Sequence, residues 1–381
     1  MHSDAVRHLR DYVAIPSVNP MGRTDIEPGW VGEARYAEFV YQQLRRLKID
    51  STVVGTGERR SVVGEVRASR SAETLMVASH LDTVPVDNMA IDPFDPVIRD
   101  GRLYGRGSCD TKAGMAALMA ALERVLARGT LARNLIVVGE ADEESSGSLG
   151  VSDVLAHLGS SRVDWVLATE PTELRLINAH KGTAVARVES RGKACHSSDP
   201  GRGKNAIVEL AHAVTCLERF GSELATKPYP GLGPATLSIG VIGGGQAPNV
   251  VPDRAWLLMD RRTLPGDTSA SMQAELRRVL QAGGLADVDV TEVRMGKYPL
   301  STPLEHPALV VCQRALSRAG RDPNVGSVAF ATDAGMFARE GIPSLVLGPG
   351  SITQAHTEAE YVEVDQLELM VGIFEQLLEG V

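Results

Sequence analysis

Histidine and carboxylate side chains gather where short apolar runs of the sequence end, and these residue types can bind metal ions and move protons. The candidates are His80, Asp82, Asp110, Asp142, Glu143, Glu144, Glu170 and His356. Imidazole nitrogens and carboxylate oxygens suit a borderline divalent ion such as zinc, and a bridging carboxylate lets two ions share one site. Each residue alone has an ordinary explanation as a structural or solvated group. Together they predict a zinc centre without thiolate ligands.

Four apolar runs explain how these side chains could meet. Residues 75–78, 135–138, 166–168 and 344–347 each have the composition of a buried strand. The first three lead directly into polar residues, and the fourth leads into Gly348-Pro349-Gly350 and then to His356. In open α/β sheets, ligands bind outside the carboxyl ends of the strands, so polar groups at these ends can form one site. A helix is expected at Ala113–Arg128, ended by Gly129 as its C-cap. The outer parts of the chain are therefore expected to form one α/β domain.

The middle of the chain has a different order of elements. Strands are expected at 183–190, 236–242, 255–261 and 287–293, and helices at 205–220 and 268–281. The order βαββαβ is the split βαβ arrangement of a small ferredoxin-like domain. We expect this domain, residues 182–294, to be inserted between two parts of the first domain, residues 1–181 and 295–381.

Composition excludes several classes of protein. The 381 residues are 43% hydrophobic and 23% charged, the mixture of an ordinary folded chain. A formal charge of −9 provides no basic field for a phosphate backbone, so no nucleic-acid partner is expected. No stretch approaches the ~18 apolar residues of a membrane span, and the first ten residues hold no apolar run of signal-peptide length. Four cysteines far apart, with no CxxC pair, favour a cytoplasmic protein.

Five segments, in order along nearly the whole chain, resemble the motifs of a di-zinc metallopeptidase family that includes aminoacylase, carboxypeptidase G and acetylornithine deacetylase. They are Ser79-His80-Leu81-Asp82-Thr83-Val84-Pro85, the segment 105–114, Asp142-Glu143-Glu144-Ser145-Ser146-Gly147, Glu170-Pro171-Thr172 and Gln354-Ala355-His356. The resemblance implies a catalytic domain of the zinc-aminopeptidase type with a mixed central sheet. It also implies that the inserted domain serves as a lid and in dimerisation.

The resemblance also implies the ligands of two zinc ions per chain, for which cobalt could substitute. One ion would be held by His80, Asp110 and Glu170, and the other by Asp110, Glu144 and His356, so that Asp110 bridges.

Two further carboxylates near these ligands have implied roles in catalysis. Asp82, two residues after His80, would accept the second imidazole N–H and fix its tautomer. Glu143 would be the general base: it takes the proton of a zinc-activated water that attacks an amide carbonyl, and passes it to the departing amine. Neither a GxSxG elbow nor an HExxH helix is present in the sequence, so the simplest serine-hydrolase and single-zinc alternatives are excluded.

Three residues of the inserted domain resemble lid positions of the family. His196 matches the histidine that stabilises the oxyanion and that dimeric members supply to the neighbouring subunit, although a surface histidine is the alternative. Asn249 and Arg262 match substrate-binding positions, and Arg262 would bind the substrate carboxylate. Arg261 leaves the register open, because only one of two neighbouring strand residues can face the cleft.

The nearest likeness within the family is to acetylornithine deacetylase, through residues 196–203 and 347–356. It implies hydrolysis of the amide bond of a small N-acyl-amino acid in the cytoplasm, in arginine biosynthesis, by a homodimer. Succinyl-diaminopimelate desuccinylases, dipeptidases and carboxypeptidases share the metal motifs, so the acyl group and side chain stay open. The non-enzyme alternative is an inactive dimeric protein that binds amino-acid derivatives.

Overall fold

The computed structural model describes residues 3–69, 73–145 and 148–380. The chain divides into two compact units. Unit 1 comprises residues 1–179, 301–327 and 332–381, and unit 2 comprises residues 180–300 and 328–331. Among the described helices, none is both long and apolar enough to cross a bilayer.

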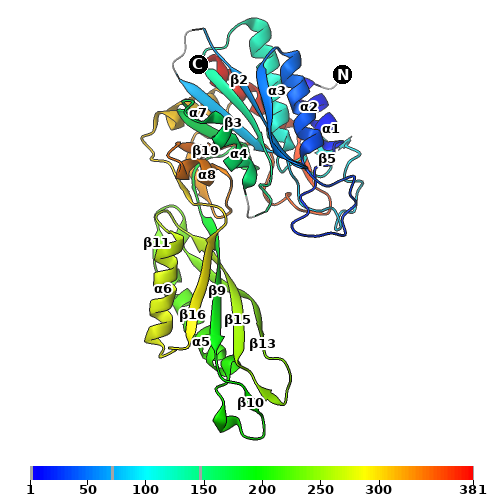
Figure 1. The fold of residues 1–381 in the computed structure, drawn as a ribbon. Coiled ribbons are helices and arrows are strands. Elements are labelled where there is room, and N and C mark those ends of the chain that lie inside the picture. The colour runs from blue at the N-terminus through cyan, green and yellow to red at the C-terminus, as the bar shows by residue number, and fades with distance from the viewer. Residues whose placement is uncertain (1–2, 70–72, 146–147, 381) are drawn as a thin grey trace. The chain divides into compact units, whose positions relative to one another are not determined.

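A mixed sheet forms the centre of unit 1 (Figure 1). Its order is β1 (Asp50–Thr56), β2 (Arg59–Val66), β6 (Asn134–Glu140), β3 (Thr74–His80), β7 (Trp165–Ala168), β19 (Ser344–Val346), β8 (Leu176–His180) and β17 (Leu300–Ser301), and β18 (Val325–Val328) also pairs with β8. The four strands β6, β3, β7 and β19 are parallel neighbours. These four contain the apolar runs predicted to be strands, and their carboxyl ends lie at one edge of the sheet. A smaller sheet contains β20 (Tyr361–Glu363), β5 (Arg102–Tyr104) and β4 (Val97–Arg99).

Helices cover both faces of the central sheet. The helices of one face are α1 (Asp4–Val13), α2 (Ala34–Arg46), α3 (Lys112–Arg128), α7 (Pro307–Arg318) and α9 (Val364–Glu379). The opposite face holds α4 (Leu149–Leu158) and α8 (Ala334–Arg339). Leu75 and Val77 of β3 pack on the first face, while Met76 and Ala78 pack on the second. This alternation explains the continuous apolar run, because a strand buried on both faces has no polar side.

Helix α3 was predicted at Ala113–Arg128, and the structure has it at Lys112–Arg128. Its residues from Lys112 to Leu122 are all buried. Alanine and leucine favour the helix, and Gly129 ends it in the left-handed conformation with φ 67°.

Unit 2 has the six main elements in the order predicted from the sequence. They are β9 (Gly182–Arg191), α5 (Ala206–Ala225), β13 (Thr236–Gly244), β15 (Arg254–Thr263), α6 (Ser269–Ala282) and β16 (Val288–Met295). The sheet order β13-β15-β9-β16 is antiparallel throughout and places the helices over one face, as in ferredoxin-like domains. The shorter elements are β10 (Cys195–His196), a 3₁₀ turn (Pro200–Arg202), β11 (Pro228–Tyr229), β12 (Gly233–Pro234) and β14 (Val250–Val251).

Side-chain caps set where both helices of unit 2 begin. The Asn205 side chain accepts hydrogen bonds from the N–H groups of Ile207 and Val208, and Thr268 forms a capping box with Ser271. Asn and Thr satisfy the free N–H groups at a helix N-terminus, which explains why both helices begin within one residue of the prediction. Helix α5 continues beyond the predicted end at residue 220 to Ala225.

Candidate metal centre

The parallel strands of unit 1 bring the predicted ligand residues together. His80 is the last residue of β3, Glu170 follows β7, and Glu144 follows β6. Asp110 precedes α3, and His356 lies in the loop after β19. Since the carboxyl ends of these strands meet at one edge, residues far apart in sequence become neighbours.

His80, Asp110 and Glu170 form the first cluster of possible ligands. All three side chains are buried, and their ligand atoms lie within 4.8 Å of one another. The Nε2 atom of His80 lies 2.9 Å from Oδ1 of Asp110. Burial raises the pKa of Glu170 well above its usual range, and the nearby charge of Asp110 adds to this increase although His80 opposes it.

Asp110, Glu144 and His356 form a second cluster with the same close spacing. The Nε2 atom of His356 lies 3.3 Å from Oδ2 of Asp110 and 3.1 Å from Oε2 of Glu144. Hydrogen bonds that the His356 ring donates to Asp110 and Glu144 raise the pKa of His356 to about 10. Asp110 therefore presents Oδ1 to one cluster and Oδ2 to the other, which is the geometry of a bridging carboxylate.

The donor set fits two divalent cations. Asp110, Glu144 and Glu170 bring three carboxylates into a largely buried region, with only two imidazoles beside them. Burying several carboxylates together is unfavourable unless cations compensate them, and burial raises the pKa of both Glu144 and Glu170. If each cluster held one ion through three side chains and shared Asp110, open positions would be left for water or substrate, as catalytic zinc sites require.

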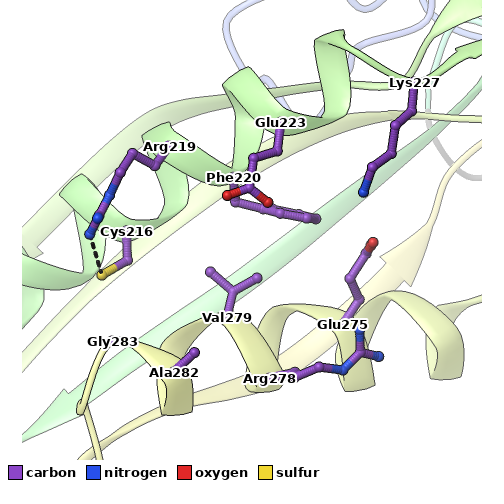
Figure 2. Close-up of a pocket in the computed structure, with 10 residues that line it drawn as sticks. All are labelled: Cys216, Arg219, Phe220, Glu223, Lys227, Glu275, Arg278, Val279, Ala282 and Gly283. Atoms are coloured by element: carbon purple, nitrogen blue, oxygen red, sulfur yellow. Dashed lines mark hydrogen bonds between the residues drawn. The ribbon is translucent and has the colours of Figure 1, made fainter.

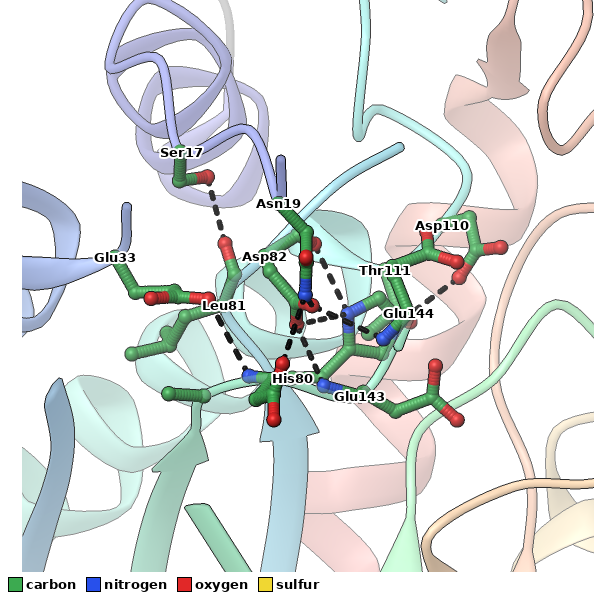
Figure 3. Close-up of polar contacts among 12 residues, drawn as sticks. Ser17, Asn19, Glu33, His80, Leu81, Asp82, Asp110, Thr111, Glu143 and Glu144 are labelled. Carbon is green, nitrogen blue, oxygen red and sulfur yellow. Dashed lines mark hydrogen bonds and ion pairs between the residues drawn. The ribbon is translucent and has the colours of Figure 1, made fainter. Parts of the chain in front are cut away.

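Asp82 lies beside the second imidazole nitrogen of His80 through both its main-chain oxygen and its carboxylate. The nearest acceptor to Nδ1 of His80 is the main-chain oxygen of Asp82 at 3.0 Å, and the carboxylate Oδ1 lies farther away at 3.4 Å. The same carboxylate also accepts hydrogen bonds from the N–H groups of Glu143 and Glu144 (Figure 3). Asp82 thus connects the ligand His80 with the segment that carries both glutamates.

Glu143 and Glu144 are adjacent but point in different directions. The carboxylate of Glu144 reaches His356, whereas Glu143 belongs to neither ligand cluster. In Figure 3 the Glu143 side chain extends away from Asp82 and is half-buried. The following residues of the motif, Ser146 and Gly147, lie outside the described part of the chain.

Two buried residues near the centre, Asn19 and Glu360, were missed by the sequence analysis. Asn19 donates a hydrogen bond to Asp82, and Glu360 accepts the main-chain N–H of Asp110. Neither residue follows an apolar run of the kind that marked the ligands. Glu360 lies four residues after His356, which was the only signal that could have drawn attention to it.

In unit 2, His196 and Asn249 lie close together at one end of the sheet. His196 is on β10, which pairs with β14, and the main-chain oxygen of Asn249 accepts the N–H of Ser197 at 3.1 Å. The exposed His196 ring contacts Ser198 Oγ at 2.7 Å through Nδ1. Both predicted residues are thus at the surface of unit 2.

The two neighbouring arginines of β15 lie on opposite faces of the unit 2 sheet. Arg261 is buried, forms a 2.7 Å ion pair with Glu275 of α6 and stacks over Phe220 of α5. The side chain of Arg262 is 42% exposed and lies 3.2 Å from Asp260. Since Arg261 is committed to the interior of unit 2, Arg262 is the arginine that remains accessible to a ligand.

A separate hollow of about 360 Å³ lies between α5 and α6 in unit 2 (Figure 2). Charged side chains from both helices line it, including Arg219, Glu223 and Arg278, and Cys216 lies at one end. None of the predicted site residues lines this hollow.

Comparison with known proteins gives a family match over most of the chain. The profile of peptidase family M20/M25/M40 matches residues 76–380. The acetylornithine deacetylase of Erwinia tasmaniensis is 33% identical over 310 residues, which cover 78% of this chain and 77% of that protein. The acetylornithine deacetylase of Klebsiella pneumoniae is 35% identical over 309 residues, which cover 76% of this chain and 75% of that protein.

Solved structures show the same fold over nearly the full chain. The M20 family metallo-carboxypeptidase of Sulfolobus solfataricus aligns with a TM-score of 0.77 and 18% identity, covering 99% of each chain. The dinuclear metal binding peptidase YXEP of Bacillus subtilis aligns with a TM-score of 0.73 and 15% identity, covering 98% of this chain and 96% of that one. The predicted fold class, an α/β catalytic domain of this family with a mixed central sheet, is confirmed.

Proposed function

Because the chain belongs to peptidase family M20/M25/M40 and is a metal-dependent amide hydrolase, we propose that it removes the acyl group from a small N-acyl-amino acid. The observation that carries this proposal is the likeness to two acetylornithine deacetylases over most of the chain. N-acetylornithine is accordingly the first substrate to test, in a reaction of arginine biosynthesis. The four cysteines are free, which supports a reducing compartment such as the cytoplasm.

Two divalent ions, zinc or cobalt, would be held by the two clusters described above. His80, Asp110 and Glu170 would bind one, and Asp110, Glu144 and His356 the other. When bound, such ions supply Lewis acidity, which lowers the pKa of a water toward neutrality and polarises the amide carbonyl. The short distances from Asp110 to His80 and His356 support this assignment.

Glu143 is proposed as the general base. Its carboxylate lies outside both ligand clusters, yet its neighbour Glu144 belongs to one of them, so Glu143 is held beside the ions without binding them. It takes a proton from the attacking water at a carboxylate oxygen and gives that proton to the departing amine nitrogen. The reaction needs no covalent acyl-enzyme.

His196, Asn249 and Arg262 are proposed to contact the substrate from unit 2. The planar guanidinium of Arg262 suits the two oxygens of the substrate carboxylate, and its exposure supports this role. A histidine N–H can stabilise the oxyanion that forms from the amide carbonyl, and Asn249, beside His196, can contact the substrate through its exposed side chain.

Distances within unit 2 support a homodimer in which His196 serves the partner's site. Arg262 pairs with Thr183 at the start of β9, whereas His196 follows the other end of that strand after Arg191. Eight residues of strand separate these ends by about 26 Å. One small substrate cannot span that distance, so Arg262 and His196 acting on the same molecule must come from different chains.

Edge strand β13 offers a surface for the dimer. Val241 and Ile242 on it are exposed, and so are Ile207 and Val208 at the start of α5. The side chain of Ile207 lies beside Gly245, which directly follows β13, so these apolar side chains lie in one region. An exposed apolar edge favours pairing with another strand, and a two-fold axis would place two β13 strands together.

A substrate panel on the purified, zinc-loaded protein tests the proposed function. N-acetylornithine, N-succinyl-diaminopimelate and a series of dipeptides would be compared by kcat/KM. We expect the N-acyl-amino acids to be hydrolysed faster than any dipeptide. Preference for dipeptides would replace the proposal with a peptidase, and binding without turnover of any substrate would favour the inactive binding protein.

A further inference from the structure

Two buried carboxylates near the metal centre make the same unusual pattern of hydrogen bonds. Asp82 accepts the N–H groups of the consecutive residues Glu143 and Glu144, at 3.1 Å on Oδ1 and 3.0 Å on Oδ2. Glu360 accepts the N–H groups of the consecutive residues Cys109 and Asp110, both on Oε1, at 2.9 Å and 3.0 Å. In each case the acceptor belongs to another segment of the chain, and the donors belong to the segment that carries a proposed ligand.

A second buried side chain donates a hydrogen bond to each of these carboxylates. Asn19 donates through Nδ2 to Oδ2 of Asp82 at 2.8 Å and to Oδ1 of Asp142 at 3.0 Å (Figure 3). Its own Oδ1 accepts the N–H of Met21 at 3.0 Å, which fixes the orientation of the amide. Asn19 is 0% exposed, so no water competes for these hydrogen bonds.

Arg106 donates to the second carboxylate, that of Glu360. Its Nη1 donates to Oε2 of Glu360 at 2.6 Å, and both side chains are 1% exposed. The other oxygen of Glu360 stays available for the N–H groups of Cys109 and Asp110. Asp82 and Glu360 are therefore arranged in the same way. Their oxygens accept main-chain N–H groups of a segment that carries a proposed ligand, and a buried side chain, Asn19 or Arg106, donates to the carboxylate.

We propose that Asn19 with Asp82, and Arg106 with Glu360, are positioning pairs that hold the two ligand segments in the shape that binds metal. The proposal rests on the proposed roles of Asp110, Glu143 and Glu144. It assigns new positioning residues, Asn19, Arg106 and Glu360, and gives Asp82 a second task beyond its contact with His80.

The ligand segments need such support because neither is held by a sheet or a helix. Glu143 and Glu144 follow the end of β6, after Asp142 with φ 66°, and Cys109 and Asp110 precede α3. Hydrogen bonds from N–H groups to an ionised carboxylate are shorter and about twice as strong as neutral ones.

The first test measures the ligand segments directly, in the metal-free full-length protein. Asn19→Leu removes the donor to Asp82 at nearly constant volume. We expect amide hydrogen exchange at Glu143 and Glu144 to become about tenfold faster, because a weakened buried hydrogen bond lowers the free energy of local opening. Asn134→Leu is the matched control: Asn134 is also a buried asparagine of unit 1, but it begins β6 at the end opposite to Glu140. That control should leave the exchange at Glu143 and Glu144 unchanged.

The second test asks whether positioning matters for metal and substrate. In Asn19→Leu we expect one of the two metals to bind at least about tenfold more weakly in competition with a chelating dye. With saturating metal, kcat should fall about tenfold or more while KM changes less than about threefold, because Glu143 acts in the reaction and does not bind the substrate. If Asn19 only stabilised the fold, Asn19→Leu would lower the midpoint of urea unfolding without this selective fall in kcat relative to KM.

The third test uses the pair of Glu360 and Arg106. Glu360→Gln keeps an acceptor oxygen for Cys109 and Asp110, so it should retain slow exchange there and near-normal metal affinity. Removing both partners in Arg106→Met/Glu360→Leu avoids an unpaired buried charge, so the protein can still fold. It should speed the exchange at Cys109 and Asp110 and weaken both metals, since Asp110 belongs to both clusters.

The outcomes separate this inference from the proposed function. Unchanged exchange in Asn19→Leu and in the double variant would overturn the positioning role, whatever the enzyme hydrolyses. Faster exchange with normal metal affinity and normal kcat would also overturn it. Faster exchange with weaker metal binding, in a parent protein that hydrolyses no N-acyl-amino acid, would support positioning and reject the proposed reaction.

Discussion

In unit 1 the proposed ligands contact one another, and His80, Asp110 and Glu170 are buried, although His356 is exposed. In unit 2, His196, Asn249 and Arg262 lie at the surface. His80, Asp110 and Glu170 lie within 4.8 Å of one another, and residues from distant segments hydrogen-bond to their loops. The His196 ring contacts Ser198, and the Arg262 side chain contacts Asp260, each two residues away. The proposed ligands of unit 1 are held in place by other residues of the chain, whereas the exposed side chains of unit 2 are free to contact a substrate or another subunit.

The difference indicates where catalytic power and where specificity reside. A preorganised centre fixes the geometry in which charge develops, and removing one of its parts costs most of the rate. An exposed residue such as Arg262 contributes about the free energy of the single contact that it makes with a ligand. Changes at the metal centre of unit 1 should therefore abolish the reaction. In unit 2, a change at Arg262 should alter selectivity, whereas a change at His196 should remove the group that stabilises the oxyanion.

The largest effect is expected from removing the metal. Dialysis against a chelator should abolish hydrolysis, because the side chains of the two clusters are themselves Lewis bases and cannot replace the Lewis acidity of the ions. Adding zinc or cobalt should restore hydrolysis. Metal analysis beside the activity assay checks the result. Full turnover in a verified metal-free sample would remove the proposed mechanism.

The next largest effect is expected from Glu143→Ala, which is compared with Glu144→Ala. Glu143→Ala should keep about two metals per chain and lose ~10²- to 10⁴-fold in kcat, the usual range for a general base. Glu144→Ala should instead weaken one metal, because only Glu144 lies in a ligand cluster. Metal titration and steady-state kinetics on both variants provide the comparison. If Glu144→Ala kept both metals and Glu143→Ala lost one, the two roles would have to be exchanged.

The sequence predicted the six main elements of unit 2 and, in unit 1, four strands and one helix, because local rules decide these elements. Apolar runs marked β3, β6, β7 and β19, and Gly129 marked the end of α3. The residues that come together at the candidate metal centre were also visible by type. His80 ends a strand and Glu144 and Glu170 follow strands, whereas Asp110 precedes α3. The fold class itself is confirmed, while the catalytic roles remain predictions.

Contacts between distant segments could not be predicted in the same way. Asn19 contacts Asp82 across 63 positions of the sequence, and Glu360 contacts Asp110 across 250. Their partners are main-chain N–H groups or a side chain on another segment, and residue types do not identify such partners. The contact of His80 with the main-chain oxygen of Asp82 was missed for the same reason, because every residue has that oxygen.

A smaller effect, on selectivity, is expected at Arg262. Arg262→Ala should lower kcat/KM for free-acid substrates by about 10- to 100-fold and for their neutral amides much less, since only the acids lose a charge-assisted pair worth ~1.5 to 3 kcal/mol. Both substrate types would be assayed on the same preparation.

Arg261→Met is the matched control for Arg262→Ala. It breaks the buried ion pair with Glu275, so it should lower the stability of unit 2 in thermal unfolding without changing the ratio of acid to amide turnover. Equal losses on acids and amides in Arg262→Ala would count against its carboxylate role.

The smallest and most specific effect concerns whether unit 2 serves its own chain or a partner. Two inactive variants, Glu143→Ala and His196→Ala, are mixed under conditions that exchange subunits. If His196 acts in the neighbouring chain, a mixed dimer has one site with both intact residues and one site with neither. Random pairing makes half of the dimers mixed, so activity should recover to about a quarter of the wild-type value by symmetry.

Geometry within unit 2 is the reason to expect recovery. His196 and Arg262 lie at opposite ends of β9, too far apart for one unit to place both on one small molecule. Supply of His196 within its own chain predicts no recovery, because every site would then keep one defect. The control is a mixture of differently tagged parent chains, which must yield doubly tagged dimers on affinity purification. Confirmed exchange with no activity would rule out the shared site, and the exposed position of His196 would then need another explanation.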